Sequence, residues 1–197
     1  MTNFNIVVCA SNGGGNFARL AEYAKCGEYN IVKLICDREC EAIGKAQQFG
    51  IVCDLVNKKE LKDLFFEKLS DAIPANIDLI VLAGFMPILS ADFCKKWQHK
   101  IINTHPSLLP KYGGKGMYGV KVQEAVMQNK EEFAGCTVHY VNEKIDGGDI
   151  IYQKKISVNY DDTPWQLGGR VFEEEAPLLI KAIKKIKLEK AQREKRG

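Results

Sequence analysis

The stretch that decides the fold reads IVVCASNGGGNFARLA and covers residues 6–21. It begins with an apolar run that suits a buried strand and continues into a polar, glycine-rich turn, SNGGGN. From Phe17 onward the apolar residues recur at helical spacing. A strand, a glycine turn and a helix in this order open an α/β unit, in which further strands pair in parallel.

The same alternation of apolar strands and amphipathic helices continues as far as residue 103. The expected strands are 31–36, 51–56, 78–83 and 101–103, and the expected helices are 41–49, 59–69 and 91–97. This alternation predicts a doubly wound, mostly parallel sheet with helices on both faces.

The pattern changes after residue 103. Residues 107–119 are rich in Gly, Pro and Lys and predict a loop, followed by a helix over 121–127. Residues 135–141 and 150–158 predict an antiparallel β-hairpin. A long amphipathic helix is expected over 163–186, capped at Thr163 and kinked at Pro177.

The amino-acid composition excludes a disordered, collagenous or coiled-coil chain. The chain has 197 residues, of which 46% are hydrophobic and 27% charged, as in ordinary soluble domains. The net charge is only +3, and seven of the 28 basic side chains lie in residues 184–197 with two of the 25 acidic ones. Residues 1–183 therefore carry a net charge of −2, and we expect no nucleic-acid partner. We expect one domain, 1–183, followed by a basic C-terminal tail, 184–197.

The cysteines and the N-terminal segment indicate a reducing compartment. The seven cysteines form no C-x-x-C pair, and with three histidines they offer no zinc-ligand spacing, so we expect free thiols and no metal. The N-terminal residues lack the pattern of a signal peptide, and the longest apolar run, 79–86, is too short to span a membrane. The expected location is cytoplasmic, with no membrane partner.

The glycine-rich turn at residues 11–16 is the first candidate site. Its glycines let a ligand approach the backbone, and the N-terminus of the following helix favours an anion. It matches neither G-x-x-x-x-G-K-[ST] nor G-x-G-x-x-G. From the residues alone it either binds a phosphate or carboxylate or is a turn that binds nothing.

Two polar segments further along the chain form the second and third candidates. Asn103 and His105 follow an apolar strand and point to the same side of an extended backbone, where an amide and an imidazole can stabilise an oxyanion and move a proton. Asp146 lies in a polar turn before Gly147 and could orient His105, or it could belong to a simple hairpin turn. We interpret His99 and His139 as structural.

Taken together, these segments and LAGFMPIL at residues 82–89 resemble the folate-dependent formyltransferases. The segment NTHPSLLPKY, residues 103–112, is highly specific to that family, and VHYV at 138–141 runs into Asp146-Gly147-Gly148. The resemblance covers residues 5 to about 180. It implies a Rossmann-like formyltransferase fold and transfer of a formyl group from 10-formyltetrahydrofolate to the amine of glycinamide ribonucleotide in purine biosynthesis.

The resemblance also implies roles for individual residues. Asn103 would bind the developing oxyanion, His105 would move the proton, and Asp146 would orient His105. The substrate-binding residues implied are Gly14, Gly15, Asn16 and either Glu175 or Glu173. The folate-binding residues implied are Met86, Pro87, Ile88, Leu89, Asn103, Asn142, Glu143, Lys144, Ile145 and Asp146.

The chain departs from the family pattern in two places. Pro87 stands where a polar or basic residue is common, and the terminal helix lacks the His that usually follows the substrate-binding Glu. Other amine acceptors, such as an amino-sugar nucleotide, and a non-catalytic ligand-binding role therefore stay open. From the length we expect no additional domain of the kind that a tRNA formyltransferase or a formyltetrahydrofolate hydrolase carries. A monomer or homodimer is expected.

Overall fold

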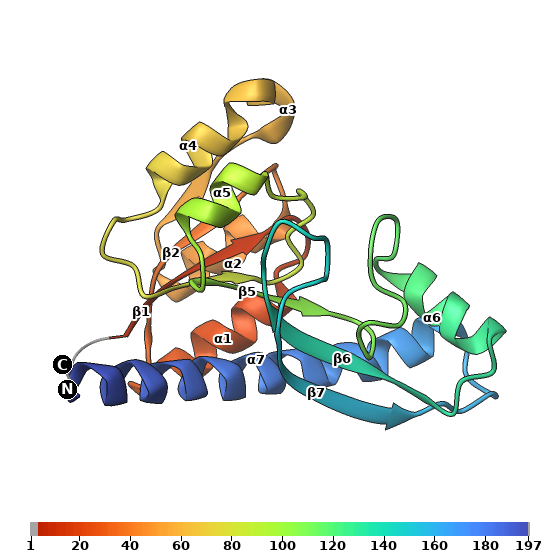
Figure 1. The fold of residues 1–197 in the computed structure, drawn as a ribbon. Helices are drawn as coiled ribbons and strands as arrows, with labels where there is room; N and C mark the ends of the chain where they lie inside the picture. Colours follow the sequence, from red (N-terminus) through yellow and green to blue (C-terminus); the bar gives the residue numbers. More distant parts are fainter. Residues whose placement is uncertain (1–3, 197) are drawn as a thin grey trace. The chain divides into compact units, whose positions relative to one another are not determined.

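The computed structural model describes residues 4–196, which fall into two compact units (Figure 1). The first unit extends to Asn103 and the second begins at Thr104. Each unit is described below by itself.

The first unit consists of strands alternating with helices. Its elements are β1 (Asn5–Ala10), α1 (Gly15–Ala24), β2 (Asn30–Cys36), α2 (Glu41–Phe49), β3 (Cys53–Leu55), α3 (Lys58–Leu61), η1 (Lys62–Leu64), α4 (Phe65–Ala72), β4 (Leu79–Leu82), α5 (Ala91–Lys96) and the beginning of β5 (Ile101–His105). The strands pair in parallel in the order β3-β2-β1-β4-β5.

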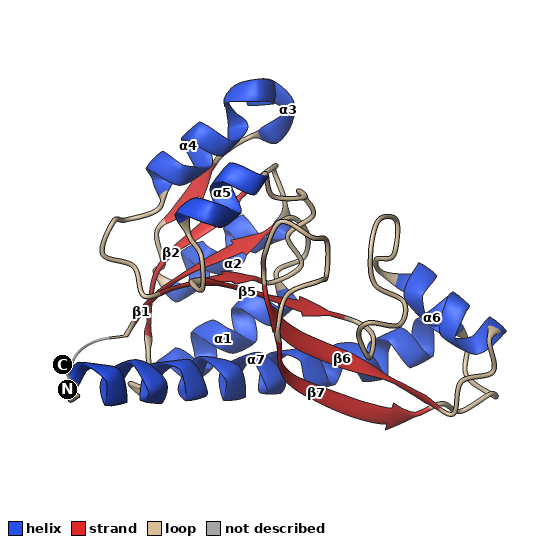
Figure 2. Cartoon of the chain, in the orientation of Figure 1, coloured by secondary structure: helices blue, strands red, loops and turns tan. Residues whose placement is uncertain are grey.

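This order makes the first unit doubly wound, which confirms the predicted fold class. The chain winds from β1 outward to β3 and then returns to β4 on the other side of β1. Helices α1 and α2 pack together through Phe17 and Phe49. Helices α4 and α5 lie side by side (Figure 2), and Phe66 of α4 contacts Phe93 of α5. The winding direction reverses between β1 and β4, and ligands of such sheets bind at the carboxyl ends of the strands at this point.

Local sequence explains where most of these elements begin and end. Every residue of β4 is buried, as expected for a central parallel strand. Helix α2 ends where Gly50 takes φ +66°, a left-handed conformation that glycine adopts without strain. The single helix predicted over 59–69 is wrong: α3 ends at Leu61 because Lys62 takes φ 48°, and the chain then passes through η1 into α4.

The second unit contains α6 (Val120–Gln128), β6 (Phe133–Tyr140), β7 (Ile150–Ser157) and α7 (Pro164–Glu194). Strands β6 and β7 are antiparallel, which confirms the predicted hairpin, and they complete the strand order β3-β2-β1-β4-β5-β6-β7. Helix α7 begins with a capping box: Thr163 Oγ1 accepts from the N–H of Gln166, and the Gln166 side chain accepts from the N–H of Thr163.

The C-terminal helix is longer than the sequence pattern predicts. Helix α7 contains Pro177 and continues across residue 184 to Glu194. The proposed boundary between a domain over 1–183 and a tail over 184–197 stays a prediction. Over residues 4–196 no helix combines the length and the apolar character that crossing a membrane requires.

Candidate active site

In the first unit, Ser11 joins the two loops that follow β1 and β4. The Ser11 N–H donates to the carbonyl of Gly84 at 3.2 Å, and its hydroxyl accepts from the N–H of Met86 at 2.7 Å. Ser11 is buried, with 1% of its surface exposed. The glycine-rich loop and the 84–89 segment are therefore held together at the point where the winding reverses.

The glycine-rich loop leads directly into α1. Gly14 caps the helix with φ +64°, and a Cβ atom built on it would lie 2.6 Å from Cβ of Ala42 in α2. Only glycine satisfies both the conformation and the space. Gly15 and Asn16 are the first residues of α1, where backbone N–H groups have no intrahelical acceptor and can bind an anion.

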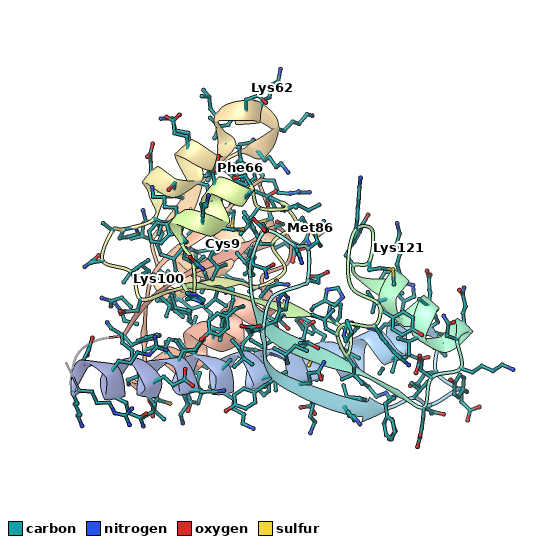
Figure 3. The ribbon with its side chains drawn as sticks, viewed as in Figure 1. Cys9, Lys62, Phe66, Met86, Lys100 and Lys121 are labelled. Carbon is teal, nitrogen blue, oxygen red and sulfur yellow. The ribbon has the colours of Figure 1, made fainter. Side chains whose placement is uncertain are left out.

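The 86–89 segment alternates exposed and buried residues. Met86 and Ile88 are 37% and 54% exposed, whereas Pro87 is buried and Leu89 is half-buried. Met86 lies beyond the carboxyl end of β4, and Lys100 lies at the opposite end of the strands, before β5 (Figure 3). The segment thus presents apolar side chains at the end of the sheet where ligands bind.

In the second unit, His105 and Asp146 lie close together. Strand β5 continues through His105, so Asn103 and His105 are two residues apart on one strand. Nδ1 of His105 is 3.6 Å from Oδ2 of Asp146, which is ion-pair range and longer than a hydrogen bond. Both side chains are largely buried, with 6% and 13% exposed.

The loop after β5 supports both members of this pair. Nε2 of His105 lies 2.8 Å from the carbonyl oxygen of Tyr112, and the N–H of Gly114 donates to Oδ2 of Asp146 at 2.8 Å. Asp146 takes φ 52°, a left-handed conformation that aspartate tolerates better than most residues. The pair is therefore oriented by main-chain groups as well as by its own strand and turn.

A buried threonine fixes the beginning of that loop. The Thr137 hydroxyl, on β6, donates to the carbonyl of Ser107 at 2.6 Å and accepts from the N–H of Leu109 at 3.1 Å. It also accepts from Gln153 Nε2 at 2.9 Å. The Leu109–Pro110 peptide bond is cis. The segment following His105 is thus tied to the central part of β6.

The turn between β6 and β7 carries the remaining residues expected to bind folate. Asn142 Oδ1 accepts from the N–H of Lys144 at 2.9 Å, and the N–H of Gly147 donates to the Lys144 carbonyl at 3.1 Å. The four residues before Asp146 are exposed: Asn142, Glu143, Lys144 and Ile145. Asp146 is the turn residue that the structure brings to His105.

The two candidate glutamates of α7 differ in burial. Glu173 is exposed, whereas Glu175 is only 8% exposed. Burial, with the nearby Glu175 carboxylate, raises the pKa of the Cys136 thiol on β6 to about 12. Glu175 therefore faces β6, and Glu173 faces solvent.

Sequence reasoning assigned no site role to His139. Nε2 of His139 lies 3.7 Å from Oδ1 of Asp146, so this carboxylate lies between two histidines. Burial lowers the pKa of His139, which favours its neutral form. His139 lies in a run of β6 residues, Ala134 to His139, that are all buried, but no local signal in the sequence places it near Asp146. Within residues 4–196 no group of three His, Cys, Asp or Glu side chains is placed to hold a metal ion.

Comparison with known proteins decides the family. The family described as formyl transferase matches residues 4–183. The chain belongs to the formyl transferase family. It is 34% identical over 185 residues to phosphoribosylglycinamide formyltransferase of Haemophilus influenzae, an alignment covering 91% of this chain and 81% of that one.

Other members of the formyl transferase family agree in sequence and fold. The chloroplastic phosphoribosylglycinamide formyltransferase of Arabidopsis thaliana is 32% identical, and the alignment covers 90% of this chain but 63% of that protein. The crystal structure of the Brucella melitensis phosphoribosylglycinamide formyltransferase superposes with a TM-score of 0.85 at 31% identity, covering 93% of this chain and 95% of that one.

Proposed function

We propose that the protein transfers the formyl group of 10-formyltetrahydrofolate to the amine of glycinamide ribonucleotide, a step of purine biosynthesis. The observation that carries this proposal is the buried His105–Asp146 pair, held by the loop of the family's NTHPSLLP segment. Family membership and the names of the relatives support it.

In the proposed reaction the substrate amine attacks the formyl carbon, and the bond from that carbon to the folate nitrogen then breaks. The Asn103 amide would donate to the formyl oxygen as negative charge develops there. His105 would take the proton that the amine loses and deliver it to the leaving folate nitrogen. Asp146 would hold the imidazole and stabilise its charged form while the proton is in transit.

Two features of the first unit suit the two substrates. The backbone N–H groups of Gly15 and Asn16 at the start of α1 would bind the ribonucleotide phosphate, in the loop shaped by Gly14. The exposed Met86 and Ile88 would contact the folate ring system together with the main chain up to Leu89. Pro87 is buried and offers the ligand no polar side chain.

The second unit offers candidate ligand contacts of its own. The main chain of the turn from Asn142 to Asp146, with the 41%-exposed Ile145, offers further polar and apolar contacts to the folate. Of the two glutamates in α7, we favour Glu175 for the substrate. A buried carboxylate is placed by its surroundings, whereas an exposed one such as Glu173 is held less firmly.

The test mixes the protein with 10-formyltetrahydrofolate and glycinamide ribonucleotide and follows tetrahydrofolate absorbance. We expect turnover, and a loss of at least about a hundredfold in kcat for His105→Ala, Asn103→Ala and Asp146→Ala. His99→Asn is the matched control, since His99 takes φ 61° and asparagine tolerates that conformation. An unchanged rate in His105→Ala would contradict the catalytic assignment.

A paired comparison tests the acceptor site. Glu175→Gln is expected to raise KM for glycinamide ribonucleotide by roughly tenfold or more, because a charged hydrogen-bond acceptor is lost, whereas Glu173→Gln is expected to leave it unchanged. Equal effects of the two substitutions would reject the assignment of Glu175.

A second acceptor is favoured by one observation: Ala176 follows Glu175 where related enzymes usually have a histidine. Turnover with an amino-sugar nucleotide and none with glycinamide ribonucleotide would show that the acceptor is the amino sugar, while the assignment as a formyltransferase would stand. Binding of folate without turnover on any amine would favour a non-catalytic role. The cytoplasmic location and a monomeric or dimeric state stay predictions, to be checked by fractionation and by light scattering.

A further inference from the structure

Outside the predicted site residues, Glu131 gathers three groups just before β6. Lys111 Nζ lies 2.8 and 3.0 Å from its two carboxylate oxygens, and the Tyr112 hydroxyl donates to Oε1 at 2.9 Å. The Tyr160 hydroxyl donates to the Glu131 carbonyl at 2.8 Å. The carboxylate therefore holds the Lys111–Tyr112 corner of the loop against the start of β6.

The main-chain carbonyl of Tyr112 faces His105. Its carbonyl oxygen lies 2.8 Å from His105 Nε2, and Tyr112 takes φ 56°. A carbonyl oxygen can only accept, so Nε2 must carry the hydrogen. The remaining ring nitrogen, Nδ1, faces Asp146 and is the one at which a proton can be gained or lost.

We propose that Glu131 is a positioning residue for His105: by holding Tyr112 it keeps the Tyr112 carbonyl on Nε2, so that proton exchange with the substrates proceeds through Nδ1. Fixing one ring nitrogen with a carbonyl is a common way in which proteins select an imidazole tautomer. The part concerning catalysis rests on the proposed function.

The ionisation of the partners supports this contact over a wide pH range. Burial and the bond to Glu131 raise the pKa of Tyr112 to about 12, so its hydroxyl stays a donor. Lys111 and Tyr112 lower the pKa of Glu131, so it stays ionised. Lys111 is 66% exposed, and an exposed ion pair contributes little, which leaves Tyr112 as the partner that matters.

The first arm of the test observes His105 without any substrate. The protein is labelled with 15N-histidine, and NMR records the ring nitrogen resonances, which distinguish a protonated from an unprotonated nitrogen. The chain has three histidines to assign. The charged and titratable groups that face His105 are Asp146 and His139. Because a change in their protonation would also affect His105, all spectra are compared at the same pH. Wild-type protein is expected to show a protonated, hydrogen-bonded Nε2 on His105.

Substitutions then separate the carboxylate from its surroundings. Glu131→Ala and Tyr112→Phe are expected to weaken the Nε2 signal and to populate the other tautomer. Glu131→Gln is expected to restore the wild-type spectrum, because its amide oxygen still accepts from Tyr112. Lys111→Ala and the exposed neighbour Glu132→Ala serve as matched controls and are expected to match wild type.

The second arm measures formyl transfer. Glu131→Ala and Tyr112→Phe are expected to lower kcat by about tenfold with both KM values changed less than about twofold, because proton transfer and not binding is impaired. The double variant should lose no more than either single one, since both break the same contact.

The two arms separate failure of this inference from failure of the proposed function. An unchanged His105 spectrum in Glu131→Ala would overturn the positioning role, whatever happens to kcat. Unchanged kcat in an active enzyme whose spectrum does change would overturn the catalytic part. Wild-type protein inactive toward every acceptor would contradict the proposed function, while the spectra still decide the contact.

Discussion

His139 shows how one buried side chain can couple the site to pH. Burial is the main cause of its lowered pKa, and the neighbouring Asp146 carboxylate opposes that shift while His105 adds to it. Its Nδ1 lies 2.8 Å from the Tyr140 carbonyl and its Nε2 faces Asp146. At the residue scale, His139, whose neutral form is favoured by burial, therefore lies beside the carboxylate that faces His105.

His139 is expected to make stability depend on pH. The ordinary pKa of histidine is 6.5, and the folded protein lowers the pKa of His139 below that value. As the pH falls, the unfolded chain therefore binds more protons than the folded protein does. The stabilisation is present above about pH 6.5 and is lost as the pH drops toward the folded value. Urea unfolding at pH 7.5 and 5.5 should show a smaller loss in His139→Gln than in wild type.

His99→Asn is the control for this measurement, because His99 is exposed. It should retain the wild-type difference between the two pH values. An equal pH difference in wild type and His139→Gln would show that His139 does not titrate on unfolding.

At the scale of elements, the loops after β1 and β5 owe their shapes to contacts with neighbouring elements. Gly14 fits beside Ala42 of α2 only because it has no side chain. The segment after His105 is held by hydrogen bonds of Ser107 and Leu109 to the Thr137 hydroxyl of β6. Lys62 interrupts the expected helix over 59–69 through a positive φ, which the spacing of apolar residues does not indicate.

Gly14→Ala is expected to destabilise the protein by about 2–4 kcal/mol, since alanine is strained at φ +64° and its Cβ would collide with Ala42. Gly27→Ala is the matched control, with φ +76° and nothing within 4 Å of a new Cβ, and should lower stability by only about 1 kcal/mol. The measurement is the free energy of unfolding in urea. Equal losses would mean that the contact with Ala42 does not matter.

Thr137→Val is expected to destabilise by about 2–3 kcal/mol, because it leaves the N–H of Leu109 without its acceptor in a buried place. Thr104→Val provides the contrast. Thr104 Oγ1 is buried and has no hydrogen-bond partner among the described residues, so removing it should be neutral or stabilising. Thermal unfolding of the two variants measures the difference, and a similar Tm for both would contradict this network.

At the scale of the whole molecule, the distribution of thiols follows the core. The seven cysteines are free; Cys9, Cys36, Cys94 and Cys136 are buried, Cys40 and Cys53 are half-buried, and Cys26 is exposed. Their spread over both units makes their reactivity a measure of how completely the chain is folded.

The native protein is expected to react rapidly with an aromatic disulfide reagent at Cys26, more slowly at Cys40 and Cys53, and hardly at the four buried thiols. Cys26→Ser should remove the rapid phase, and unfolding in denaturant should expose all seven. Stopped-flow absorbance with mass spectrometry assigns the sites. Rapid reaction of the buried thiols in native protein would contradict the packing described above.

Much of the fold could be predicted because its signals are local. The apolar run before Ser11, the glycines after it and the alternation of strands and helices each depend on residues within one turn or one strand. The hairpin and the capped terminal helix follow for the same reason. The residues alone left a contact between His105 and Asp146 open, and resemblance to a family implied it, since the two are 41 positions apart in the sequence.

What the sequence by itself determined is the doubly wound, mostly parallel fold class, and it also nominated the residues that we propose to carry the chemistry. Only the tertiary structure decided that Ser11 holds Met86, that Asp146 lies between His105 and His139, and that Glu131 holds Tyr112. Except for His139 and Asp146, which are seven positions apart on either side of a turn, these contacts join residues well separated in the chain. They form only after strands pair and loops close, and no periodicity within a segment records which distant side chain will then lie within reach.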